Sequence, residues 1–174
     1  MSYLVISSSL NPESRSRVLA QSAFKSLQET GVATRWLDLA DYTLPLCDGH
    51  STYDDPQVVE VAGYIKEADG IIFAVPIYNF YANAAAKNLI ELAGSAWSNK
   101  IVGFLCAAGG KASYMSVMGL ANTLMLDFRC LIIPRFAYAT GDSFEDATLS
   151  DPKVKTRILE LTQEMDRMCQ ALKK

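Results

Sequence analysis

The chain opens with YLVI (residues 3–6), SSSLNPESRSR (residues 7–17) and VLAQSAFKSL (residues 18–27). The first stretch is typical of a short buried strand, and the third has the spacing of an amphipathic helix. The hydroxyl-rich loop between them therefore joins the carboxyl end of a strand to the amino end of a helix. Backbone N–H groups and serine hydroxyls bind phosphate well at such a junction, because the helix dipole favours negative charge there.

A second interpretation of this loop is that its serine and asparagine side chains only cap the helix. In the same way, Arg15 and Arg17 either neutralise a phosphate or are ordinary solvated helix charges. The loop lacks the GxGxxG of a dinucleotide-binding fold and the GK[ST] of a P-loop, so it supports neither an NAD-type Rossmann site nor a nucleotide triphosphatase.

Strand-like and helix-like segments alternate along the rest of the chain. Strands are expected at residues 3–7, 33–37, 70–75, 101–107 and 131–133. Helices are expected at residues 16–30, 56–68, 82–94, 114–128 and 152–172, the second and fifth starting at a proline behind an aspartate cap, Asp55 or Asp151. Five strands separated by helices predict right-handed βαβ units and a parallel sheet with helices on both faces.

Composition narrows the class of protein. A length of 174 residues favours one domain, and 50% hydrophobic residues are enough for a substantial core. A formal net charge of −3 argues against a nucleic-acid partner held by a broad basic surface. Neither a secretory signal nor a membrane-spanning run is recognisable. The four cysteines are widely spaced and form no zinc motif, and a reducing cytoplasm is the simplest setting.

In parallel sheets ligands bind beyond the carboxyl ends of the strands, so the loops after strands one, three and four belong together. The loop at residues 76–83 carries three aromatic residues and two asparagines, and these side chains can frame a flat ring or cover the core or an interface. The loop at residues 107–114 contains Gly109-Gly110, which either allows a ligand close to the backbone or is a plain flexible turn.

Taken together, the three loops resemble the NAD(P)H-dependent FMN reductases, a flavodoxin-like family that includes quinone, azo-dye and chromate reductases. The family's first loop has the form G-S-x-R-x-x-S-x-N, where residues 8–16 read SSLNPESRS. Residues 76–79, PIYN, match P-x-Y-N, and residues 87–91, KNLIE, resemble the L-K-N-A-I-D that follows it. The glycine pair matches as well, and the similarity extends over nearly the whole chain.

The resemblance implies a flavodoxin-like three-layer sandwich, with a five-stranded parallel sheet in the order 2-1-3-4-5 and one FMN-binding domain at residues 1–174. It implies phosphate contacts near Ser9, ring contacts near Tyr78 and backbone contacts with the pyrimidine end at Gly109. The cofactor-binding residues expected in this way are Ser9, Asn11, Ser14, Arg15, Ser16, Pro76, Ile77, Tyr78, Asn79, Phe80, Gly109 and Gly110.

The chain departs from the family pattern at three places. Ser8 replaces the usual glycine, and Asn11 replaces the usual arginine, so one cation for the phosphate is missing unless Arg15 or Arg17 replaces it. Where the family often has Ser/Thr-x-Pro-Gly after P-x-Y-N, this chain has Ala82-Asn83-Ala84-Ala85.

The implied activity is hydride transfer from NADPH or NADH to flavin N5, followed by electron delivery to a small-molecule acceptor. The flavin carries this chemistry, so no catalytic side chain and no metal is expected, and His50, the single histidine, is expected to be a loop residue. A quinone, azo or chromate reductase with tightly bound FMN is an alternative. Two others are a flavodoxin-like electron carrier and a non-catalytic interaction domain.

The same family resemblance also implies partners for this protein. S-R-S loops occur in the branch of the family that supplies reduced FMN to flavin-dependent monooxygenases, which makes such an enzyme a possible partner. The expected helices at residues 82–94 and 114–128 carry more apolar or small residues than one sheet-facing stripe requires. With the resemblance, this surplus predicts a homodimer or homotetramer with the flavin near the interface.

Overall fold

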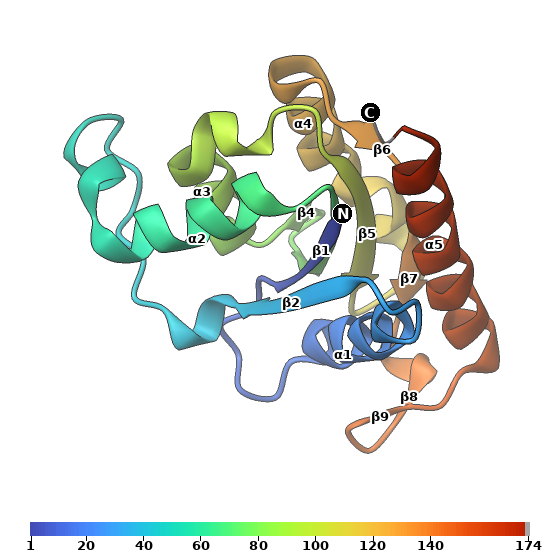
Figure 1. Ribbon diagram of the computed structural model, residues 1–174. Helices are drawn as coiled ribbons and strands as arrows, with labels where there is room; N and C mark the ends of the chain where they lie inside the picture. The colour runs from blue at the N-terminus through green and yellow to red at the C-terminus, as the bar shows by residue number, and fades with distance from the viewer. Residues whose placement is uncertain (173–174) are drawn as a thin grey trace.

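The computed structural model describes residues 1–172, which fold around a seven-stranded sheet (Figure 1). The main path of the sheet runs β2-β1-β3-β5-β6, and neighbouring strands on this path are parallel. These strands are β1 (Ser2–Ser7), β2 (Ala33–Asp38), β3 (Gly70–Tyr78), β5 (Ile101–Ala107) and β6 (Leu131–Ile132). This is the doubly wound, flavodoxin-like order that the sequence predicted.

Helices cover both faces of the sheet. In Figure 1, α1 (Arg15–Gln28) and α5 (Pro152–Ala171) lie on one side, and α2 (Pro56–Glu67) and α3 (Ala84–Ala93) lie on the other, together with α4 (Met118–Phe128). Side chains alternate between the faces, since Tyr3 packs with α1 and α5 while Leu4 packs with α2, α3 and α4. Burial on both faces explains why β3 and β5 are continuous apolar runs.

The expected aspartate caps are confirmed. Asp55 accepts hydrogen bonds from the N–H groups of Gln57 and Val58 at 2.8 and 3.3 Å, in front of α2. Asp151 accepts one from the N–H of Lys153 at 2.8 Å, in front of α5. Each side chain satisfies a donor that the first turn of a helix leaves without a partner.

The prediction of five strands is wrong in number. The expected strand at residues 131–133 is β6, and a further short strand that was not expected, β7 (Ala137–Ala139), also pairs with β5. Between them Pro134 has no N–H to donate, and Arg135 adopts a left-handed φ of 62°, so the ladder is interrupted. A second small strand, β4 (Tyr81–Ala82), pairs antiparallel with the end of β3 and delays the third helix to Ala84.

Two further segments differ from the expected pattern. The helix expected from residue 114 starts as 3₁₀ turns at Lys111–Val117 and becomes α-helical at Met118. The segment after β7 contains a small antiparallel hairpin of β8 (Phe144–Glu145) and β9 (Thr148–Leu149), which lies below α1 in Figure 1.

Across residues 1–172, no helix has the length and apolar character needed to cross a bilayer.

Candidate functional site

The loops that follow β1, β3 and β5 surround one cavity of about 990 Å³ at the carboxyl edge of the sheet. All twelve residues that the sequence placed in a cofactor site line this cavity. Five residues outside that set line it as well: Glu13, Ala107, Ala108, Ala112 and Ser113. The parallel register thus brings three segments that are far apart in the chain into one hollow.

One end of the cavity is built to bind an anion. Ser14 caps α1, since its hydroxyl accepts a hydrogen bond from the N–H of Arg17 at 3.3 Å, and its Oγ lies 2.9 Å from that of Ser16. Among the described residues, the N–H groups of Arg15 and Ser16 have no intramolecular acceptor. Free N–H groups at the positive end of a helix, beside buried serine hydroxyls, are the donors that a phosphate requires.

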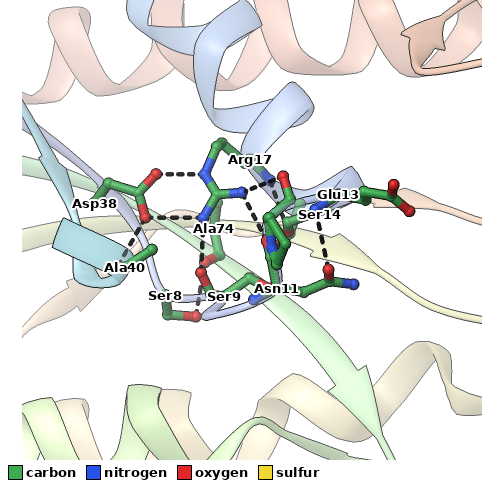
Figure 2. A network of polar contacts seen from close by, with 11 residues as sticks. Ser8, Ser9, Asn11, Glu13, Ser14, Arg17, Asp38, Ala40 and Ala74 are labelled. Carbon is green, nitrogen blue, oxygen red and sulfur yellow. Dashed lines mark hydrogen bonds and ion pairs between the residues drawn. The ribbon is translucent and has the colours of Figure 1, made fainter.

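Arg17 does not line the cavity. Figure 2 shows its guanidinium between Asp38 and the backbone of the first loop. Its guanidinium forms an ion pair with Asp38 at the end of β2, and the two side chains are 15% and 7% exposed. It also donates to the carbonyl oxygens of Ser9, Asn11 and Pro12 at 3.0, 2.7 and 3.1 Å. Because these carbonyls point toward Arg17, Arg15 is the arginine of the pair that is left to face a ligand.

The aromatic loop is a tight hairpin that joins β3 to β4. Tyr78 pairs with Tyr81, and the two residues between them, Asn79 and Phe80, have φ values of 51° and 62°. Two left-handed residues define a type I′ turn, in which Asn-Gly is the favoured pair. Phe80 occupies the position of the glycine, although a bulky side chain disfavours this backbone conformation. The residue is 67% exposed and lies beside the cavity.

The glycine pair contributes open space and not an unusual backbone conformation. Neither Gly109 nor Gly110 adopts a left-handed φ. A Cβ atom added at either position would meet nothing within 4 Å, so the pair leaves open space beside the backbone. The hydroxyl of Tyr138 in β7 donates to the carbonyl of Gly110 at 2.5 Å and lies 2.8 Å from Oγ of Ser113.

Sequence reasoning missed three polar residues at this site, of which Glu13 and Ser113 line the cavity and Tyr138 lies behind it. Glu13 adds a carboxylate to the anion-binding end, and its N–H bonds to Oδ1 of Asn11 at 3.0 Å. Ser113 lies in the glycine loop, where its hydroxyl type was a signal that could have been used. Tyr138 was not predictable, because the strand that carries it is too short and irregular to have a recognisable pattern.

Other reactive side chains lie away from the cavity. His50 is in an exposed loop and does not line it, as the sequence predicted. Cys106 and Cys130 are buried, and burial raises the pKa of both thiols, which keeps them protonated. Within residues 1–172, His, Cys, Asp and Glu form no group of three that could hold a metal ion.

Comparison with known proteins finds a matching family model and several relatives of this chain. A family model described as NADPH-dependent FMN reductase matches residues 1–145. The FMN reductase (NADPH) of Pseudomonas putida is 32% identical over 122 residues, which are 68% of this chain and 60% of that protein. The NAD(P)H:quinone oxidoreductase of Solanum tuberosum is 28% identical over 161 residues, which are 86% of this chain and 83% of that protein.

The aligned part of this chain spans 51 to 60% of the length of the first curated relatives that it matches. Among solved structures, the apo form of an NADH:FMN oxidoreductase superposes with a TM-score of 0.79 at 19% identity, covering 99% of this chain and 90% of that one. At this identity the superposition shows a shared fold.

The Arg17–Asp38 ion pair predicts that replacing Asp38 with the similarly shaped asparagine strongly lowers the free energy of unfolding. Asp38→Asn keeps the shape and the acceptor for the N–H of Ala40 but leaves a buried guanidinium without its counter-charge. We expect the free energy of unfolding to fall by about 3 kcal/mol. Glu67→Gln, which breaks the exposed Arg35–Glu67 pair, is the control and should cost less than about 1 kcal/mol. Urea unfolding measures both, and equal effects would contradict the assignment.

The left-handed backbone at Phe80 predicts an unusual order of stabilities. Phe80→Gly and Phe80→Ala remove the same ring, but only glycine is free of the steric penalty at a φ of 62°. The glycine variant should therefore be more stable than the alanine variant by about 1 kcal/mol, as measured by urea or thermal unfolding. If alanine is equal or better, the hairpin does not hold the conformation described.

Proposed function

Because the chain belongs to the NADPH-dependent FMN reductase family, we propose that it binds FMN between the three loops and passes electrons from NADPH or NADH to a small-molecule acceptor. The observation that carries this proposal is the division of one cavity into two chemically different ends. One end has the serines and free N–H groups at the start of α1, and the other has the Tyr78–Phe80 hairpin and the open Gly109-Gly110 backbone.

The residues present fit FMN. The cavity volume of about 990 Å³ lies within the range of 300–1,000 Å³ that is usual for small-molecule sites. Ser9, Ser14 and Ser16 are buried hydroxyls beside the positive end of a helix, and they suit a phosphate dianion. The hairpin supplies two exposed aromatic side chains for a flat ring, and the glycine loop leaves room for the ring edge.

The protein's own residues bind and orient in this proposal. When bound, FMN supplies the hydride-accepting and electron-transferring ring. The serine loop holds the phosphate, and Arg15 provides the cation that Asn11 does not. Tyr78 and Phe80 shape the access to the ring and leave room for the nicotinamide and the acceptor to enter in turn. The nearby cations Lys111 and Arg135 are not among the cavity-lining residues.

A quinone reductase is a second candidate function, because the relative from Solanum tuberosum aligns over 86% of this chain. The two functions use the same cavity and differ in the acceptor and in flavin retention. A reductase that supplies reduced FMN to a monooxygenase must release it between turnovers, whereas a quinone reductase keeps it. Acceptor preference and flavin content of the purified protein therefore separate the two.

The cellular setting is part of the proposal. The four cysteines form no disulfide in the described residues, which fits a reducing compartment such as the cytoplasm.

Exposed apolar side chains on and before α4, including Met115, Met125 and Leu126, support a homodimer or homotetramer. Gel filtration with light scattering tests this, and a monomer at assay concentration would contradict it.

The activity is tested on purified protein in three steps. First, its visible spectrum reports any bound flavin. Second, NADH and NADPH oxidation is followed at 340 nm with and without added FMN. Third, a soluble quinone is added as acceptor. Oxidation that requires added FMN supports the flavin reductase, and oxidation with a quinone at constant bound flavin supports the alternative. Absence of flavin binding and of oxidation under all conditions would overturn both.

Arg15 predicts a selective effect on phosphate binding. Arg15→Gln removes the cation at the start of α1, so FMN should bind about tenfold more weakly while riboflavin, which has no phosphate, binds unchanged. Fluorescence titration at low salt measures both affinities. Lys25→Gln, an exposed site on the same helix, is the matched control. Ser14 is a less suitable site, because its substitution also removes the cap of α1.

A further inference from the structure

Two residues outside the cavity connect the first loop to the aromatic loop. Nδ2 of Asn83 donates to the carbonyl of Ser8 at 2.7 Å, and the hydroxyl of Ser8 lies 2.8 Å from Oδ1 of Asn83. Ser8 is fully buried and Asn83 is 6% exposed, and neither lines the cavity. The backbone N–H groups anchor the same residues to β3, since Ser8 donates to Ala74 at 3.0 Å and Asn83 donates to Pro76 at 3.1 Å.

Asn83 makes this connection instead of its usual local contact. It occupies the N-cap position of α3, where asparagine is among the favoured residues, yet its side chain makes no capping hydrogen bond. The side chains at the corresponding positions of α1, α2 and α5, which are Ser14, Asp55 and Asp151, all cap their helices. The side chain of Asn83 is thus committed to Ser8 at the expense of a helix cap.

Both residues lie where the chain departs from the sequence pattern of its family. In the loop patterns that this sequence resembles, Ser8 falls on a glycine position, which has no hydroxyl, and Asn83 lies in the Ala82–Ala85 segment that falls on Ser/Thr-x-Pro-Gly. Two departures that are 75 residues apart in sequence form one buried, reciprocal contact. The contact satisfies the carbonyl of Ser8 and the side-chain amide of Asn83, which would otherwise be buried without a partner, while the Ser8 hydroxyl also lies 3.0 Å from the carbonyl of Ala74.

We propose that Ser8 and Asn83 are positioning residues that hold the two ends of the cavity at a fixed distance from each other. Ser8 directly precedes Ser9 of the anion-binding end, and Asn83 directly follows the hairpin that carries Tyr78 and Phe80. A ligand that contacts both ends gains affinity when they are already held at the required spacing. This inference rests on the proposed function for the identity of that ligand, FMN.

The test compares ligands that use both ends or one. In Ser8→Ala and Asn83→Ala, FMN should bind roughly tenfold more weakly, while riboflavin, which lacks the phosphate, loses much less. Ser8→Ala is the milder change and keeps the assay informative if Asn83→Ala unfolds. The matched control is Ser26→Ala with Thr162→Val, which removes a side-chain hydrogen bond of 2.8 Å between α1 and α5, away from the cavity. The control should lower stability without changing the ratio of the two affinities.

A second readout needs no ligand. Amide hydrogen exchange at Ser8 and in residues 9–14 should accelerate in Asn83→Ala, although the substitution lies 75 residues away in sequence, and should stay unchanged in the control. Unchanged exchange in the first loop, or an equal loss of FMN and riboflavin in both variants, would overturn the inference. A wild-type protein that binds no FMN would instead contradict the proposed function, and the exchange result would still decide whether the two loops are coupled.

Discussion

The structure depends on the parallel pairing of β1, β3 and β5, which are buried on both faces of the sheet. In this register Ser7 lies beside Ala74, and Ala74 lies beside Leu105, so the three strands end at the same edge. Apolar side chains on both faces hold the register, because a slip would expose one set of them to water. The three loops that surround the cavity meet as a consequence, and no contact between the loops is needed to bring them into the same region.

Polar contacts then refine the arrangement that the sheet creates. Arg17 and Asp38 hold the carbonyls of the first loop away from the cavity, and this leaves N–H groups and hydroxyls facing it. Ser8 and Asn83 tie that loop to the start of α3, and Tyr138 ties the glycine loop to β7. Each loop of the site is thus fixed by a residue that does not itself line the cavity. Of the side chains that line the cavity, those of Arg15, Tyr78 and Phe80 are exposed toward solvent.

Much of this was readable in the sequence, and what was missed has particular causes. The strand order, the two aspartate caps and the membership of the cavity followed from apolar runs, capping signals and the resemblance in three loops. The role of Arg17 did not, because a charge near a helix start looks the same whether it faces solvent or folds back onto a loop. The split of the last strand at Pro134 and Arg135 was also missed, since an interrupted edge strand two or three residues long has no recognisable pattern.

By itself the sequence determined the fold class, the family and which residues gather at the carboxyl edge, because apolar periodicity and loop chemistry are local properties of the chain. Only the tertiary structure decided which of those residues face the cavity and which support it from behind. Ser8 and Asn83 each looked like an isolated departure from a family pattern, and in the structure they hydrogen-bond to each other. Hydrogen bonds between residues 75 positions apart depend on the packing of the sheet, and no short stretch of sequence contains that information.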